Sequence, residues 1–166
     1  MEKYKLTNET KQVGNTTLHR IQALRDFYDV KTGDYGGWIE KERNLPQSDD
    51  AWVYGDARVY GNAWVSGNAR VSGNARVSDD AWVSGNAWVS GNADYLIISP
   101  IGSRDACLTV TFKPSLQIMT GCFVGTVEEF EKSVLETHGD NQYAQEYMAT
   151  IEYIKKLSAI RLRGKD

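Results

Sequence analysis

The residues of this sequence with the clearest potential for chemistry lie in its last third. Gly102-Ser103-Arg104-Asp105 offers backbone N–H groups, a hydroxyl and a guanidinium, which together suit a phosphate or a carboxylate. Gly121-Cys122-Phe123 would lie on a nearby turn, and the junction of two predicted helices carries two more polar side chains. The predicted lining of a pocket for a small anionic ligand is therefore Ser103, Arg104, Cys122, Phe123, His138 and Asn141. The alternative is that Arg104 pairs with a carboxylate and simply fixes the loop.

The sequence predicts no catalytic residue, no metal site and no cofactor. His19 lies in the N-terminal segment, where a packed or surface role is expected, and His138 ends a predicted helix, whose dipole favours an imidazolium. Cys107 and Cys122 lie in or beside predicted strands without a neighbouring histidine, so we expect two buried thiols. Metal-ligand spacings, a P-loop and a dinucleotide-binding fingerprint do not occur in the sequence.

A six-residue repeat precedes this cluster and must position it. Between Asp49 and Tyr95, alanine recurs every six residues, valine follows it by two positions, and Asn or Asp precedes it. Ala-x-Val alternates in, out and in, as in a short strand with one buried face, while Gly-Asn and Gly-Asp turn the chain. A strand and a corner every six residues predict a triangular coil in which residues 18 apart lie above one another.

This pattern resembles the hexapeptide-repeat left-handed β-helix, in which valine fills the core and alanine fits the cramped corners. The resemblance implies a mainly β fold built on a short left-handed parallel β-helix. An α-helix is excluded because Gly and Asn would break it every six residues. Disorder is excluded because valine and tryptophan recur in strict phase.

The outward position between alanine and valine is often tryptophan. When these outward residues are grouped by their spacing of 18 positions, one face carries Trp52, Arg70 and Trp88, and another carries Trp64 and Trp82. An arginine between two indoles allows cation–π contacts. Large apolar stripes left in water are unusual for a monomer, so we expect these five residues to form an oligomer interface. Left-handed β-helices commonly pack around a threefold axis, and this resemblance implies a homotrimer, with a hexamer as a further option.

The chain divides into three expected regions. Residues 1–48 form an N-terminal β cap and a first irregular coil, residues 49–96 the β-helix, and residues 97–166 a small α+β unit. Within the cap, residues 18–23 and 26–39, which include Gly36-Gly37-Trp38-Ile39, resemble the N-terminus of YdcK-like bacterial β-helix proteins, which are classed as candidate acyltransferases. Acyl transfer is therefore an alternative function, although the repeats contain neither the histidine nor the projecting loop that such enzymes usually use.

The C-terminal unit is expected to combine a β meander with two helices. Strands are predicted at residues 95–98, 106–112 and 116–120. Thr126 and Glu129 form a capping box for a helix that runs to about Thr137. A second helix follows with Tyr143, Tyr147, Ile151 and Ile154 as its apolar stripe. Residues 161–165 are basic and are expected to form a solvated terminus.

This unit also resembles a module that recurs in uncharacterised phage and prophage proteins, often behind hexapeptide repeats. The resemblance rests on Pro100-Ile101-Gly102-Ser103-Arg104, Gly121-Cys122-Phe123 and Thr137-His138-Gly139-Asp140-Asn141. It implies a viral accessory protein that acts in the bacterial cytoplasm.

Charge and composition exclude some classes of binding partner. The 166 residues carry a net charge of −3, which argues against binding duplex nucleic acid through its phosphates. The sequence has no apolar run of about 20 residues and no signal-peptide core at its start, so we expect no membrane partner and a cytoplasmic location. The preferred function is a non-enzymatic oligomeric binding protein that captures a small anionic ligand, such as a nucleotide signal of bacterial defence, or a host protein. A hexapeptide-repeat acyltransferase and a structural assembly element are the alternatives.

Overall fold

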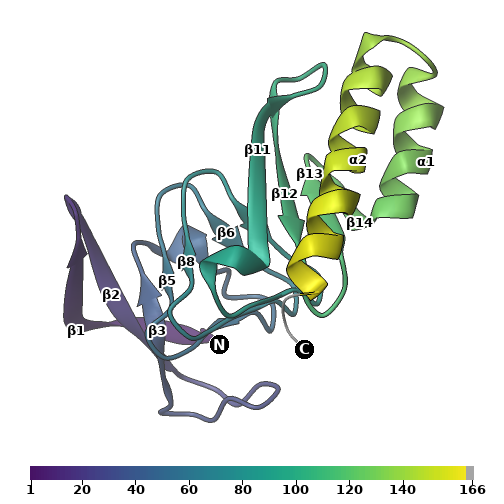
Figure 1. The fold of residues 1–166 in the computed structure, drawn as a ribbon. Coiled ribbons are helices and arrows are strands. Elements are labelled where there is room, and N and C mark those ends of the chain that lie inside the picture. The colour runs from purple at the N-terminus through teal and green to yellow at the C-terminus, as the bar shows by residue number, and fades with distance from the viewer. Residues whose placement is uncertain (164–166) are drawn as a thin grey trace.

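The computed structural model describes residues 1–163. A short coil of parallel strands lies between an N-terminal β cap and a C-terminal unit of four strands and two helices (Figure 1). Of the described helices, none is both long and apolar enough to cross a membrane.

The coil consists of seven two-residue strands, each formed by the outward residue and the valine of one repeat. They are β4 (Trp52–Val53), β5 (Arg58–Val59), β6 (Trp64–Val65), β7 (Arg70–Val71), β8 (Arg76–Val77), β9 (Trp82–Val83) and β10 (Trp88–Val89). Parallel pairing joins β4 to β7 to β10, β5 to β8, and β6 to β9, in three separate sheets. Each of these pairs aligns residues 18 apart, such as Trp52 with Arg70, which confirms three repeats per turn.

Small apolar side chains fill the inside of the coil. Every repeat alanine from Ala51 to Ala87 and every valine from Val53 to Val89 is buried. The eighth repeat departs from this pattern, because the 3-10 turn η2 (Asn92–Asp94) replaces the strand and leaves Ala93 exposed.

The corners of the coil are formed by residues with positive φ. Gly61 has a φ of +69°, and a Cβ at this position would lie 3.2 Å from the backbone nitrogen of Asp79 in the next coil. Asp79 occupies the equivalent corner with a φ of 59°, one of the few non-glycine residues in that region. Aspartate tolerates this conformation because its short polar side chain bonds locally, here by accepting from Ser78 Oγ at 3.1 Å.

The N-terminal cap closes one end of the coil. Its elements are β1 (Tyr4–Val13), β2 (Thr16–Ala23), β3 (Tyr35–Ile39) and the 3-10 turn η1 (Glu42–Asn44). The first three strands are antiparallel, and β3 then pairs in parallel with β5, so one ladder of the coil continues into the cap.

The cap covers Trp52, and the prediction that this residue lies on an open outer face is wrong. The rings of Tyr4 and Phe27 meet the indole edge-on, with centroids 6.0 and 5.2 Å away. Trp52 is consequently 1% exposed. Hexapeptide periodicity places this side chain outside the coil, but it contains no information about which elements pack against the coil.

The C-terminal unit is an antiparallel sheet with two helices. Its strands follow one another as β11 (Tyr95–Ile101), β12 (Ala106–Thr111), β13 (Gln117–Thr120) and β14 (Phe123–Thr126), and the helices are α1 (Val127–His138) and α2 (Gln142–Arg163). Its core is separate from that of the coil and includes Leu108, Ile118, Phe130 and Ile154. The predicted capping box is confirmed: Glu129 N donates to Thr126 Oγ1 at 3.2 Å, and Thr126 N donates to the Glu129 carboxylate at 2.8 Å.

The prediction that residues 161–165 form a solvated terminus is wrong for its first residues. Residues 161–163 are still part of α2, and Arg161 donates to the carbonyl of Ala93 at 2.9 Å and lies 4.6 Å from the ring centroid of Phe112. This arginine therefore ties the last helix to the end of the coil. Residues 164 and 165 of that prediction lie outside the described residues.

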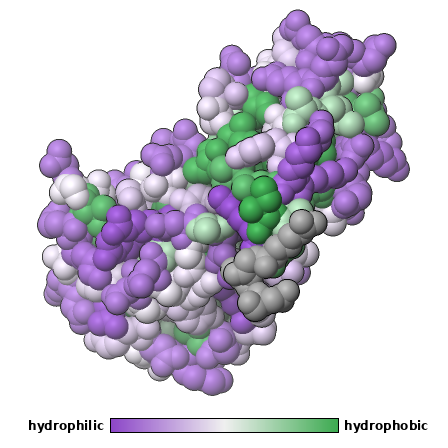
Figure 2. Space-filling model, viewed as in Figure 1, coloured by the Kyte–Doolittle hydropathy of each residue, from purple (hydrophilic) through white to green (hydrophobic). Residues whose placement is uncertain are grey.

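The open end of the coil meets the C-terminal sheet. Backbone N–H groups of the last coil donate to this unit: Trp82 N to Thr109 Oγ1 at 2.9 Å, and Trp88 N to the carbonyl of Lys113 at 2.8 Å. Figure 2 shows mainly hydrophilic residues on the visible face of the coil, while hydrophobic residues gather over β11 and the adjoining part of α2. The sheet thus covers strand edges that would otherwise remain unpaired.

Candidate functional site

Five of the six predicted ligand-binding residues line one hollow of about 270 Å³ in the C-terminal unit. Its lining consists of Ser103, Arg104, Cys122, Phe123 and His138, with Ala106, Thr120, Gly121, Ser133, Thr137 and Tyr147. These residues come from the β11–β12 turn, the β13–β14 turn and both helices, so the hollow exists only when the whole unit is folded.

A tight turn presents the polar residues of this hollow. Asp105 N donates to the carbonyl of Gly102 at 3.2 Å, and Gly102 has a φ of +71°. A Cβ on Gly102 would lie only 2.0 Å from the hydroxyl oxygen of Tyr147, so only glycine lets the turn pack against α2 in this way. Ser103 and Arg104 are thereby held, exposed, at the mouth of the hollow.

Arg104 supplies the positive charge. It forms no salt bridge with any residue among 1–163, which removes the alternative that it only fixes the loop by pairing with Asp105 or with a helix carboxylate. A guanidinium without a carboxylate partner can bind an anion through paired N–H donors.

Aromatic rings form one wall of the hollow. His138 stacks on Tyr147 with ring centroids 5.8 Å apart and an interplanar angle of 28°. Tyr147 also meets Phe130 edge-on at 5.4 Å, and Phe123 lies 5.1 Å from Phe130. Burial raises the pKa of Tyr147, so its hydroxyl stays protonated and neutral at physiological pH. The hollow therefore combines one cation, hydroxyl groups and a flat aromatic surface.

Asn141 does not line the hollow. Its side-chain oxygen instead accepts from the backbone N–H of Tyr143 and Ala144, at 2.9 and 3.1 Å, and so caps α2. The predicted lining also lacks six residues of the hollow, among them Ser133 and Thr137. Ser133 and Thr137 are four residues apart in α1 and therefore lie on the same face of the helix, a signal that could have found them.

The two cysteines differ from the prediction of two buried thiols. Cys122 is exposed at the mouth of the hollow, because the turn after β13 projects from the sheet. Cys107 is half-buried in β12, and burial raises its pKa, which keeps the thiol protonated. Within residues 1–163, no group of three His, Cys, Asp or Glu side chains is placed to hold a metal ion.

The remaining outward residues of the coil occupy two different environments. Trp64 and Trp82 stack with centroids 5.3 Å apart at an angle of 8°, and Trp64 is 42% exposed. Arg70 lies between Tyr28 and Trp88, with its guanidinium carbon 3.8 and 5.6 Å from the two ring centroids. The predicted contact of Arg70 with two indoles is thus half right: Tyr28 from the cap takes the place of the buried Trp52.

Comparison with known proteins supports the coil and little beyond it. Residues 51–67, 65–79 and 69–85 match the family model "YdcK Beta solenoid repeat". The chain contains a YdcK-like β-solenoid region. It is also 37% identical over 62 residues to "Uncharacterized acetyltransferase YdcK" of Escherichia coli strain K12, a match that covers 32% of this chain and 19% of that protein. The chain spans about a fifth of the length of this curated relative, and the matched family model lies within the YdcK-like solenoid, outside the C-terminal hollow.

Proposed function

We propose that this protein is a non-enzymatic binding protein whose C-terminal hollow captures a small anionic ligand. The observation that carries the proposal is the convergence of Ser103 and Arg104, from the β11–β12 turn, with His138, from the end of α1, around one hollow with an aromatic wall. A guanidinium beside stacked rings suits a ligand with both a negative charge and a flat ring, and nucleotides combine the two. The resemblance of the C-terminal unit to phage modules favours a nucleotide signal of the bacterial host as the first class to test.

The solenoid is the scaffold of this proposal. We take its winding as left-handed, the sense of the hexapeptide repeats that it resembles, and its assembly as a homotrimer. The support is the stacked pair Trp64 and Trp82, whose partly exposed rings form a flat apolar surface that a second copy could cover. Three subunits would then display three copies of the C-terminal hollow.

Ligand capture is tested by titrating protein freed of bound molecules with a panel of cyclic mono- and dinucleotides, using calorimetry. We expect Arg104→Gln to weaken binding at least tenfold, because it removes a charge-assisted pair of hydrogen bonds. Arg76→Gln, a change of an exposed arginine on the coil, is the matched control and should leave the affinity unchanged. Equal affinities of the Arg104→Gln and unsubstituted proteins, or no binding to any nucleotide of the panel, would overturn the proposal.

Assembly is tested by native mass spectrometry of the freshly purified protein, which also detects a molecule that co-purifies. We expect a trimer, and replacement of both Trp64 and Trp82 by serine should reduce it to monomers. Trp88→Ser changes an indole of similar exposure on another face and should leave the trimer intact. A monomeric unsubstituted protein would contradict this part of the proposal without touching the hollow.

The acyltransferase alternative gains little from the structure. Its support is the name of the relative, whose match covers a fifth of that protein. Residues 49–96 contain no histidine, and His19 lies in β2 of the cap, paired with Ile39 and Thr10 in the sheet.

A further inference from the structure

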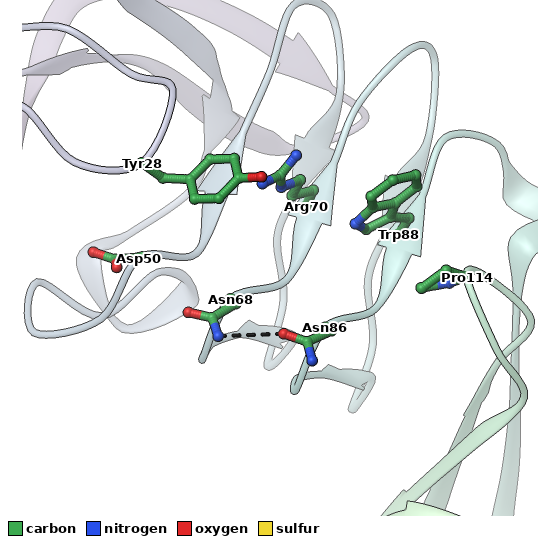
Figure 3. A pocket seen from close by; sticks show the side chains of 7 residues that line it. All are labelled: Tyr28, Asp50, Asn68, Arg70, Asn86, Trp88 and Pro114. Atoms are coloured by element: carbon green, nitrogen blue, oxygen red, sulfur yellow. Dashed lines mark hydrogen bonds between the residues drawn. The ribbon is translucent and has the colours of Figure 1, made fainter.

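A second recess lies on the coil, on the face formed by β4, β7 and β10. It consists of two adjoining hollows of about 280 and 410 Å³ that share Arg70 and Trp88. Tyr28 from the cap stands at one end of this face and Pro114 from the β12–β13 connection at the other (Figure 3). Because both ends are walled, the face is a trough and not a flat surface such as the one around Trp64.

Arg70 is held in the trough with its charge available. Its guanidinium lies between the rings of Tyr28 and Trp88, which limit its movement without neutralising it. Arg70 makes no salt bridge within the described part of the chain. Asp29, the nearby carboxylate, accepts from the hydroxyl of Tyr54 at 2.8 Å and attracts the guanidinium of Arg70 only from beyond salt-bridge distance. The guanidinium is therefore positioned to bind one anionic group.

A polar row runs along one side of Arg70. Asp50, Asn68 and Asn86 occupy the same corner in three successive coils, and all three are exposed. Asn68 Nδ2 donates to Asn86 Oδ1 at 3.2 Å, so the two amides are oriented as a ladder (Figure 3). The outer ends of this ladder, an acceptor on Asn68 and a donor on Asn86, together with the Asp50 carboxylate, are suited to hydroxyl groups.

Trp88 adds a flat apolar platform. Its indole is 48% exposed and lines both hollows beside Arg70. An aromatic face of this kind packs well against the apolar face of a pyranose ring. One cation, a row of hydroxyl-binding groups and an aromatic platform are the features expected of a site for a sugar that carries a carboxylate.

We infer that this trough binds an acidic oligosaccharide, with a uronate carboxylate on Arg70, a sugar ring on Trp88 and ring hydroxyls on the Asn68–Asn86 ladder. A nucleotide fits less well for electrostatic reasons. The first hollow holds one positive charge and the negative Asp50, which suits a single carboxylate better than several phosphate charges. At the far end, Lys113 forms a salt bridge with Asp94 at 3.0 Å.

The test compares two trisaccharides on the full-length protein by calorimetry. The probes are trigalacturonate and the uncharged galactose trisaccharide of the same linkage. We expect trigalacturonate to bind at least tenfold more tightly, because only its carboxylates can pair with Arg70. Arg70→Gln should abolish this difference, Trp88→Ala should weaken binding of both sugars, and Arg76→Gln, on another face of the coil, should change neither.

Several results would overturn the inference. Equal affinities of the two sugars for the unsubstituted protein would remove the role of Arg70, and this comparison does not depend on whether a variant folds. Binding of nucleotides in this trough, measured as a loss of nucleotide affinity in Arg70→Gln, would assign the site to another ligand class. Arg104→Gln should leave trigalacturonate binding intact, so failure of the C-terminal nucleotide site and failure of this trough are distinguishable.

Discussion

The coil and the C-terminal unit bury their apolar side chains in opposite ways. The coil uses alanine and valine at every turn, and each buried residue has an equivalent 18 positions away. The core of the C-terminal unit consists of large side chains that have no equivalent in a repeat, such as Leu108, Phe130 and Ile154. Repetition makes the coil faces nearly interchangeable, whereas each candidate ligand site depends on residues that do not repeat: the turn at Gly102 in one site, and Tyr28 and Pro114 in the other.

The two ends of the coil extend this contrast. In a stack of identical coils, the outer backbone N–H and C=O groups of the first and last strands have no partner strand. Non-repeating segments must therefore cover both ends. The cap covers the first end by burying Trp52, and the C-terminal unit covers the last by accepting hydrogen bonds from Trp82 N and Trp88 N. The C-terminal unit therefore both carries a candidate site and completes the coil.

The largest expected effect separates two tryptophans in the same column. Trp52 and Trp88 both pair with Arg70, but the first is 1% exposed and the second 48% exposed. Trp52→Ala should lower the free energy of unfolding by about 4 kcal/mol, because it leaves a cavity between Tyr4, Phe27 and the coil. Urea unfolding followed by circular dichroism measures this change.

Trp88→Ala is the matched control for that measurement. It removes the same side chain from an open position and should cost less than about 1 kcal/mol. Equal losses of unfolding free energy in the two variants would show that covering Trp52 with the cap does not stabilise the protein. The two tryptophans would then not differ in the way that their exposure predicts.

A smaller effect is expected from pH at the junction of the two regions. Burial alone would raise the pKa of Asp94, but hydrogen bonds from Ser90 and Lys113 outweigh it and lower the pKa from 3.8 to about 2. A carboxylate with a depressed pKa in the folded state stabilises the fold above its ordinary pKa, and this stability is lost as the pH falls from about 4 to about 2. The loss should reach about 2 kcal/mol.

Chemical unfolding at a series of pH values between 7 and 2 checks this prediction. Asp94→Asn removes the titrating group, so its stability at pH 7 should be lower and its loss on acidification should be smaller than in the unsubstituted protein. Identical acid profiles for the two proteins would mean that the junction does not depend on this carboxylate.

The coil was predictable because its pattern of buried residues and corners repeats every six positions. A buried alanine and valine every six residues leave one arrangement that hides both, and the observed pairing of Trp64 with Trp82 follows from the spacing alone. What periodicity cannot supply is the identity of covering elements. Nothing in the sequence pattern indicates that Tyr28 replaces Trp52 beside Arg70, or that Lys3, close to the chain start, is fully buried with its Nζ 3.0 Å from Asp49.

Five of the eleven residues that line the hollow in the C-terminal unit were predicted, for a different reason. Turn residues are constrained by backbone geometry, so Gly102 and Gly121 mark where the two turns must lie, and both have positive φ. The error at Asn141 has a physical cause as well, since asparagine before a helix is a strong N-cap and its side chain is used by the backbone of α2. A residue that satisfies its own helix is not available to a ligand.

The smallest predicted effect tests whether the two regions unfold as one. Thr126→Ala removes the acceptor for Glu129 N at the start of α1 and should cost about 1 kcal/mol, whereas Thr126→Ser keeps the oxygen and should cost a few tenths at most. Because the C-terminal sheet holds the last strands of the coil, the helical signal at 222 nm and tryptophan fluorescence, which comes mainly from the coil, should shift to lower urea together. A shift of the helical signal alone would mean that the coil stands without its C-terminal cover, and that the hydrogen bonds from Trp82 N and Trp88 N contribute little to its stability.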